Sequence, residues 1–302
     1  MFINQAYKGN NEFWRFLITT FLTTGMFLAN FIMYFFVSKE QINEAYESMA
    51  KLPKSQVLIT NLSPFVFLLI LLIYLVYFLH KRSVLSLTTS RNKVDYKRIW
   101  FSFGLIVLLN IGCFAVSYII DNSAIIWNFK PIPFVILFSI SVLMFPFQIA
   151  FEEYLFRGYL MQQIGIIVKN SWFPLLFTSV VFGLFHSFNP EVEKLGYAVM
   201  FFYVGTGFLL GVMTLMDDGI ELALGFHLGN NLIAALLITS DFSAIQTDAI
   251  FKYSGIENTV DVLNEMLVSI VIVYPIILII FVKKYKWTNW SEKIMGKHCS
   301  SN

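Results

Sequence analysis

Long apolar runs recur along this chain of 302 residues and dominate what it can fold into. A helix needs about 20 apolar residues to cross the hydrocarbon core of a bilayer, and eight segments reach or approach that length. They are Trp14–Val37, Val57–Leu79, Ile99–Ile120, Ile132–Val168, Trp172–Phe188, Tyr197–Met216, Ile220–Ile238 and Val262–Val282. The sequence therefore predicts an all-α, polytopic membrane helix bundle of about eight transmembrane helices.

The composition excludes several other classes of protein. Only 13% of the residues are charged, whereas a soluble domain carries about 25%. This deficit argues against an ordinary soluble enzyme, a disordered chain and a nucleic-acid binder. The two cysteines, Cys113 and Cys299, provide neither a disulfide framework nor a thiolate metal cluster. The run Ile132–Val168 is too long for one straight span, and we expect it to tilt, to kink at Pro146 or to continue past the membrane surface.

Basic residues gather in two of the polar connectors. They are Lys81, Arg82, Arg91, Lys93, Lys97 and Arg98 in one loop, and Lys283, Lys284, Lys286, Lys293 and Lys297 in the tail. Cytoplasmic connectors of membrane proteins carry an excess of lysine and arginine. With eight spans this bias predicts that both termini lie inside, N-in/C-in, with the basic residues near anionic lipid.

Ionisable residues are costly at membrane depth and mark functional sites. The first three runs hold almost none, whereas the later runs contain Glu152, Glu153, Arg157, His186 and His227, with Asn230 and Asn231 close by. The chain has four histidines; His80 and His298 lie in polar, basic surroundings, and the other two lie inside apolar runs. This segregation indicates a polar site within the bundle.

The carboxylates of the fourth run have a suggestive spacing. Glu153 and Arg157 are four residues apart, with the acid first, which is the favourable order for a helical ion pair. Glu152 lies about 100° around the helix from Glu153, so it can face a site and act as a general base. The alternative is a buried charge cluster that only joins helices.

The fourth and fifth runs form a hairpin in this interpretation. Its turn lies near Lys169–Asn170; Glu152 precedes Lys169 by 17 residues and His186 follows it by 17. If both flanks are helical and antiparallel, these two side chains meet at one depth. His227, close after the sixth run, reaches that depth only if the hairpin projects past the membrane surface or the helices tilt.

The seventh run adds further polar groups. His227 and Asn231 share a helix face and could donate hydrogen bonds to an oxyanion. Alternatively, His227 and His186 could bind Zn²⁺ with Glu152, or the polar residues could form a network that only fixes helix register. The glycine pairs Gly225/Gly229 and Gly207/Gly211, with Gly183, predict close helix packing.

Three motifs then resemble those of a known family. Glu152-Glu153-x-x-x-Arg157, followed by Gly158, Phe182-x-x-x-His186 and His227-x-x-x-Asn231 resemble, in order, the motifs of the CPBP intramembrane proteases. This family, also called Abi, includes type II CAAX prenyl endopeptidases and bacteriocin-processing or self-immunity proteins. The resemblance covers residues 132–238, about a third of the chain.

The resemblance implies an intramembrane endopeptidase. Glu152 would activate the attacking water with help from His186, His227 and Asn231 would stabilise the oxyanion, and Glu153 and Arg157 would support the site. The family is commonly called metalloprotease, and a metal-free mechanism has also been argued; zinc on Glu152, His186 and His227 stays open, and His-Glu-x-x-His is absent. The implied partners are a peptide or protein substrate at the membrane and the lipid bilayer, in the plasma membrane of a prokaryote.

We expect three parts along the chain. Residues 1–131 hold N-terminal transmembrane helices with the basic loop, 132–238 form the catalytic core, and 239–302 hold the last transmembrane helix and the basic tail. Two other functions stay open. One is a transporter that uses the same polar residues as a relay, although no internal repeat supports it. The other is a non-catalytic immunity or scaffold protein.

Overall fold

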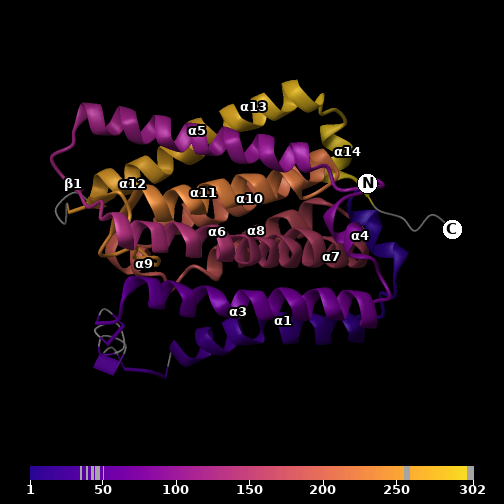
Figure 1. Ribbon diagram of the computed structural model, residues 1–302. Coiled ribbons are helices and arrows are strands. Elements are labelled where there is room, and N and C mark those ends of the chain that lie inside the picture. The colour runs from indigo at the N-terminus through magenta and orange to yellow at the C-terminus, as the bar shows by residue number, and fades with distance from the viewer. Residues whose placement is uncertain are drawn as a thin grey trace.

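The computed structural model describes residues 1–34, 36–38, 40–41, 44, 48–49, 51–254 and 259–297. It confirms the predicted all-α membrane helix bundle (Figure 1). Among the described residues, six helical runs are long and apolar enough to cross a membrane. The predicted spans Trp172–Phe188 and Ile220–Ile238 form shorter apolar helices of 13 and 17 residues. His298 and Cys299 lie outside the described residues.

The elements follow one another in three groups. The first contains η1 (Ile3–Lys8), α1 (Phe13–Tyr34), α3 (Lys54–Tyr74), the π-helical segment η2 (Leu75–Leu79), α4 (Val84–Thr88), α5 (Tyr96–Ile120) and β1 (Ile125–Trp127). The second contains α6 (Pro131–Glu153), the π-helical segment η3 (Tyr154–Leu160), α7 (Met161–Val168), α8 (Trp172–Leu184), α9 (Pro190–Leu195), α10 (Val199–Asp217) and α11 (Glu221–Leu237). The third contains β2 (Ile238–Ser240), β3 (Phe251–Tyr253), α12 (Thr259–Val268), the π-helical segment η4 (Ser269–Val273), α13 (Tyr274–Tyr285) and α14 (Trp290–Met295).

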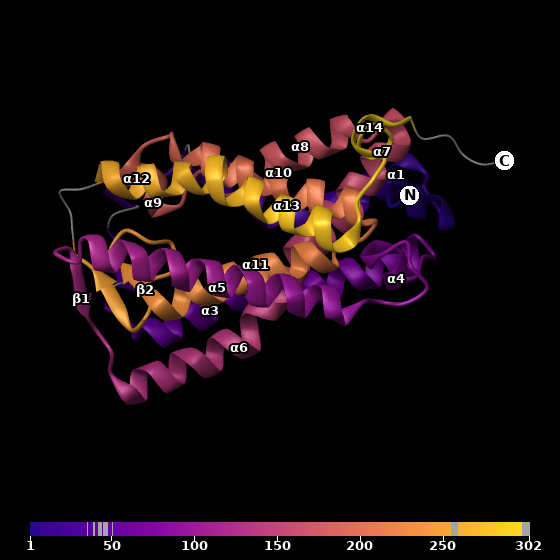
Figure 2. The same cartoon turned by 90° about the horizontal axis from the view of Figure 1, so that it is seen from above.

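The two helices α10 and α11 run through the middle of the bundle (Figure 1). Helices α5 and α13 lie on one side of them, and α1 and α3 lie on the other. The turned view shows α6 diverging from α11 towards the end of the molecule that carries β1 (Figure 2). The closest neighbours are α5 with α11, α8 with α10, and α6 with both α3 and α11.

The two ends of the bundle differ in character. The N-terminus, α4 and α14 gather at one end, here called the basic end (Figure 1). Arg91, in the loop after α4, and Arg98, in the first turn of α5, contact Asp217 at this end. A small sheet lies at the other end, where β3 pairs antiparallel with β1 and parallel with β2. The sequence did not indicate these strands, because each is only three residues long.

The long fourth run is one continuous helical path, 131–168. Pro146 lies inside α6, and the path changes to π-helical geometry directly after Glu153. π-Helical turns often occur at functional sites. Lys169 then adopts a left-handed conformation with φ 58° and ends α7, and α8 begins at Trp172. The predicted hairpin turn at Lys169–Asn170 is therefore confirmed.

Glycines let the central helices approach closely, as predicted. A Cβ atom at Gly207 of α10 would lie 2.9 Å from the carbonyl oxygen of Ser179 in α8. A Cβ atom at Gly229 of α11 would lie 3.0 Å from the carbonyl oxygen of Phe103 in α5, and one at Gly225 would overlap the carbonyl of Ile99. These contacts hold α11 firmly against α5 and fix the side chains that α11 presents.

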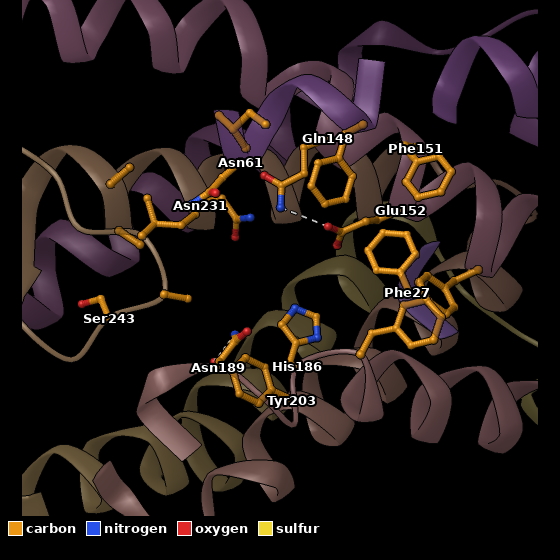
Figure 3. Close-up of a pocket in the computed structure, with 18 of the residues that line it drawn as sticks. Phe27, Asn61, Gln148, Phe151, Glu152, His186, Asn189, Tyr203, Asn231 and Ser243 are labelled. Carbon is orange, nitrogen blue, oxygen red and sulfur yellow. Dashed lines mark hydrogen bonds between the residues drawn. The ribbon is translucent and has the colours of Figure 1, made fainter. Parts of the chain in front are cut away.

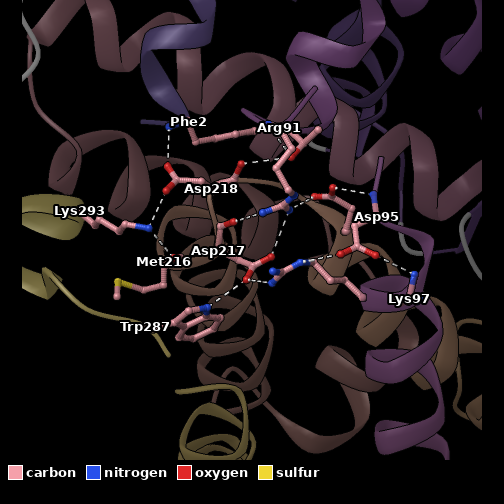
Figure 4. Close-up of polar contacts among 12 residues, drawn as sticks. Phe2, Arg91, Asp95, Lys97, Met216, Asp217, Asp218, Trp287 and Lys293 are labelled. Atoms are coloured by element: carbon pink, nitrogen blue, oxygen red, sulfur yellow. Dashed lines mark hydrogen bonds and ion pairs between the residues drawn. The ribbon is translucent and has the colours of Figure 1, made fainter. Parts of the chain in front are cut away.

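A buried ionic cluster joins the elements of the basic end (Figure 4). Asp217 accepts hydrogen bonds from Arg91, Arg98 and, at 3.0 Å, Trp287. Arg91 also binds the fully buried Glu221 at 2.7 Å. The neighbouring Asp218 accepts from the backbone N–H of Phe2 and from Lys293. Two arginines of the basic loop thus pair with acids at the α10–α11 turn.

Candidate functional site

A cavity of about 500 Å³ lies between α1, α3, α6, α10 and α11, and the segments after α8 and α11 also line it (Figure 3). Its polar lining consists of Asn61, Gln148, Glu152, His186, Asn189, Tyr203, Asn231 and Ser243. Its aromatic lining consists of Phe27, Phe65, Phe151, Phe156 and Phe185, besides Tyr203. Three residues predicted from the sequence, Glu152, His186 and Asn231, therefore share one cavity. The other three, Glu153, Arg157 and His227, lie behind its wall.

Glu152 presents its carboxylate to the cavity from the last turn of α6. The residue is 7% exposed. One carboxylate oxygen, Oε1, accepts a hydrogen bond of 3.0 Å from Nε2 of Gln148, one helical turn earlier. The other oxygen, Oε2, is buried without a hydrogen-bond partner among the described residues. Glu152 thus has one oxygen held and one oxygen free to act on a ligand.

Glu153 anchors a fully buried group behind Glu152. Its Oε1 accepts hydrogen bonds from Arg157 at 2.9 Å and from Nδ1 of His227 at 2.8 Å. Glu153 and Arg157 are both 0% exposed, and Arg157 also donates to the carbonyl of Gly207 at 3.1 Å. Its guanidinium lies 4.6 Å from the ring centre of Phe182, a cation–π arrangement. The expected pairing of Glu153 with Arg157 is present, and it extends to His227 on α11.

His186 lies just after the end of α8 rather than inside the helix as expected, because α8 ends at Leu184. Its Nδ1 lies 2.8 Å from the carbonyl oxygen of Phe182. A carbonyl can only accept, so Nδ1 carries a proton and Nε2 of the neutral ring keeps its lone pair. The ring stacks on Tyr203, with centroids 4.5 Å apart, and the hydroxyl of Tyr203 accepts from Asn189 at 3.2 Å. Figure 3 shows His186 opposite Glu152.

His227 meets the carboxylates from the facing helix. Its Nε2 lies 3.7 Å from Oε2 of Glu152, while Nδ1 donates to Glu153. The difference in depth that the residue numbers suggested therefore does not keep α11 and α6 apart. Asn231 lies one turn further along α11 and lines the cavity. Its neighbour Asn230 turns away and accepts from Asn110 of α5 at 3.3 Å.

The arrangement does not fit the zinc ligand set considered above. Within the part of the chain that the structure describes, no group of three or more His, Cys, Asp or Glu side chains is placed to hold a metal ion. Nδ1 of His227 is already bound to Glu153, and Nδ1 of His186 is bound to a backbone carbonyl. Nε2 of His227 and Oε2 of Glu152 lie 3.7 Å apart.

Gln148 and Tyr203 contact predicted site residues, and sequence reasoning missed both. Gln148 precedes Glu152 by four residues, and this spacing on one helix could have identified it. Tyr203 had no such signal, because it reaches His186 from α10 through the tertiary fold.

Comparisons with known proteins agree with the resemblance in the motifs. Residues 132–233 match the model of a family described as type II CAAX prenyl endopeptidase Rce1-like. The chain is also 28% identical over 248 residues to the uncharacterized protein YyaK of Bacillus subtilis (strain 168). The aligned region covers 78% of this chain and 81% of that protein. No solved structure matches the chain significantly.

The family match covers about half of the residues that line the cavity. It includes α6, α8, α10 and most of α11, and all six site residues predicted from the sequence. The expected resemblance is confirmed for residues 132–233. Together with the six candidate spans, it supports an integral, multi-pass membrane protein with protease-like function of the CAAX type.

Proposed function

We propose, with the Rce1-like match of residues 132–233 as the premise, that this chain is an intramembrane endopeptidase. Its substrate is a peptide or protein segment in or at the membrane, and the protein lies N-in/C-in in the plasma membrane of a prokaryote. The observation that carries the proposal is the convergence of Glu152, His186 and Asn231, from three separate segments, on one cavity of about 500 Å³.

Glu152 is the general base in this mechanism. Its free Oε2 accepts a proton from a water molecule as the water oxygen attacks the carbonyl carbon of the scissile bond. Nε2 of His186, the unprotonated nitrogen, accepts a hydrogen bond from the second proton of the same water and orients it. When the tetrahedral intermediate collapses, the C–N bond breaks and the leaving amine takes the proton from Glu152.

The developing oxyanion is stabilised from α11. The amide of Asn231 donates a hydrogen bond to it, and each such donor is worth about 10²–10³ in rate in well-studied proteases. His227 joins Asn231 when its ring carries a proton on both nitrogens, and Glu153 then balances the charge through Nδ1. Arg157 keeps Glu153 in place from the opposite side.

The aromatic part of the cavity supports an apolar substrate. Phe27, Phe65, Phe151, Phe156 and Phe185 line the cavity together with Glu152. Rings of this kind gain free energy by burying apolar surface, about 25 cal/mol for each Å². We infer that a large apolar side chain or an isoprenoid group of the substrate lies against these rings while the scissile bond faces Glu152.

Replacement of Glu152 tests the proposal. Membranes from cells that produce the wild-type protein or Glu152→Gln are compared by mass spectrometry of peptide termini. We expect termini that appear with the wild type and disappear with the variant, since Gln cannot accept the proton. Glu193→Gln, a change at an exposed glutamate, is the matched control and should leave those termini unchanged. Thermal unfolding measurements show whether both proteins are folded. If both are folded and yield identical termini, Glu152 is not the general base of an endopeptidase.

A further inference from the structure

Among the described residues that line the cavity, Gln148 alone forms a hydrogen bond to the proposed base. It lies on α6, four residues before Glu152, and its side chain points to the cavity (Figure 3). Its amide nitrogen donates to Oε1 of Glu152 at 3.0 Å. Only the NH₂ end of an amide can donate to a carboxylate, so its oxygen must face the other way. That oxygen, Oε1, is buried and has no hydrogen-bond partner among the described residues.

The bond from Gln148 determines how Glu152 presents its charge. The terminal torsion of a glutamate side chain has a broad energy profile, so a free carboxylate rotates easily. With Oε1 held by Gln148, Oε2 is directed to the side where Nε2 of His227 lies 3.7 Å away. Loss of the hydrogen bond would leave the carboxylate free to turn away from the attacking water.

The side-chain oxygen of Gln148 is buried without a hydrogen-bond partner among the described residues, so a ligand could supply the missing donor. A buried polar atom without a partner costs about 1–3 kcal/mol, so native proteins leave few of them. This oxygen and Oε2 of Glu152 are both unpaired in the same cavity. The scissile peptide bond would lie beside Glu152, and each substrate residue other than proline offers one backbone N–H donor. A substrate N–H is therefore the chemical group that fits the oxygen.

We propose that Gln148 is a positioning residue that links substrate and base: its amide nitrogen holds Glu152, and its amide oxygen accepts a hydrogen bond from a backbone N–H of the substrate. The proposal rests on the proposed endopeptidase function. It makes docking of the peptide backbone and orientation of the base depend on one side chain.

Two variants of Gln148 separate these roles. The probe is a synthetic peptide that spans a cleavage site found in the comparison of termini. Gln148→Met keeps the size of the side chain but removes both hydrogen bonds. We expect kcat to fall about 10–100-fold, because misplacement of a catalytic group by about 1 Å costs up to 10²-fold. We expect KM to rise about 3–10-fold, as for the loss of one hydrogen bond.

Gln148→Glu places a second carboxyl group next to Glu152. Two neighbouring carboxyl groups share one proton, so the acidic limb of the pH–rate profile should move about one unit to higher pH. A shift would show that position 148 contacts the base, and the fall in kcat of Gln148→Met tests whether the amide positions it. Gln163→Met is the matched control: it removes a buried amide that donates to Asn11 at 3.0 Å and should not shift the profile.

A modified peptide tests the contact with the substrate. In a set of peptides, each backbone N–H near the cleavage site is replaced in turn by an ester oxygen. We expect one replacement to reduce kcat/KM about 10-fold with the wild type and to have no effect with Gln148→Met.

The outcomes separate this inference from the proposed function. If the wild type cleaves, Glu152→Gln does not, and Gln148→Met has wild-type kcat and KM, the inference is wrong and the function stands. If the wild type and Glu152→Gln yield the same termini, the function itself is wrong. Equal ester effects in the wild type and Gln148→Met would overturn the contact with the substrate.

Discussion

Glu153 organises the site at the scale of single residues. It is fully buried and bonds to both Arg157 and His227, two cationic or potentially cationic groups from different helices. A buried ion pair contributes little net stability, but removing one partner leaves an uncompensated charge. Glu153 therefore couples the folding of this region to the orientation of His227.

We predict that Glu153→Gln impairs both stability and activity. The neutral amide cannot balance Arg157, and loss of one partner of a buried pair costs about 3–5 kcal/mol. Its NH₂ group can also face Nδ1 of His227 and force the other tautomer. We expect a lower thermal midpoint and a fall in kcat of about 10² or more; in another protease, loss of the carboxylate that orients the histidine cost about 10⁴. Thermal unfolding and turnover of the probe peptide measure these effects, and unchanged turnover in a folded variant would contradict the role given to Glu153.

Single residues also show what the sequence could and could not reveal. Glu152, His186 and His227 were proposed from the sequence because charge and imidazole are rare inside apolar runs, so each stood out without a structure. Gln148 and Tyr203 are ordinary residues of such runs, and their importance comes only from what they touch. His80 was expected in polar surroundings and does contact polar groups, but it is also fully buried, because the N-terminal segment folds over it.

Helix α11 carries His227 and Asn231, so its packing against α5 matters at the scale of elements. The contact depends on Gly225 and Gly229, which have no room for a Cβ atom. By contrast, Gly104 and Gly112 of α5 have no neighbouring heavy atom within 4 Å of a Cβ position. Replacement by alanine should therefore lower stability at Gly225 and Gly229 but not at Gly104 and Gly112.

We predict that Gly225→Ala destabilises the protein and slows cleavage, because α11 must move away from Ile99 and carry His227 with it. The thermal midpoint should fall by about 5 °C or more, since each kcal/mol corresponds to about 2–4 °C in a protein of roughly this size. Gly104→Ala and Gly112→Ala should keep or raise the midpoint, because alanine is favoured over glycine in helices by about 1 kcal/mol. Equal midpoints for all three variants would show that α11 does not depend on this contact.

The elements were predictable where a pattern of residues reports them directly. Apolar length located the long helices, and the polar break at Lys169–Asn170 located the hairpin. The π-helical segment after Glu153 was not predictable, because a shift of backbone hydrogen bonds leaves no mark in the apolar pattern. The end of α8 at Leu184 was also missed, because Phe185 and Phe188 flank His186 and Ser187 and extend the apolar pattern past the helix end.

At the scale of the whole molecule, the basic end also contains contacts that the sequence pattern could not predict. Arg91 and Arg98 were interpreted only as determinants of topology and as neighbours of anionic lipid, yet both bind Asp217 at the α10–α11 turn (Figure 4). These partners are more than 100 residues apart in the chain. Sequence reasoning about neighbours along a helix cannot detect such pairs, although they hold the ends of the helices that carry the site.

A second polar group at the basic end makes stability depend on pH. His80 is fully buried; its Nδ1 donates to the carbonyl of Asn10 at 2.8 Å, and Nε2 lies 3.0 Å from the hydroxyls of Thr19 and Tyr159. A neutral ring satisfies these contacts, with Nε2 as the acceptor. Burial lowers the pKa of His80 below its ordinary value of 6.5, and the charge of Arg82 lowers it further, against the hydrogen bond to Asn10.

We therefore predict a loss of stability as pH falls through about 6.5. In the unfolded chain, His80 takes up a proton near pH 6.5, whereas in the folded protein its lowered pKa delays this uptake to lower pH. Acid therefore favours the unfolded state. The contribution of neutral His80 to stability is fully present only above about pH 6.5. In detergent, the thermal midpoint of the wild type should fall by a few degrees between pH 7.5 and pH 5.5, at about 2–4 °C per kcal/mol. His80→Gln should be less stable at pH 7.5 but should lose less on acidification, because other titrating groups affect both proteins alike. Parallel pH dependences for the two proteins would place the acid sensitivity in another group.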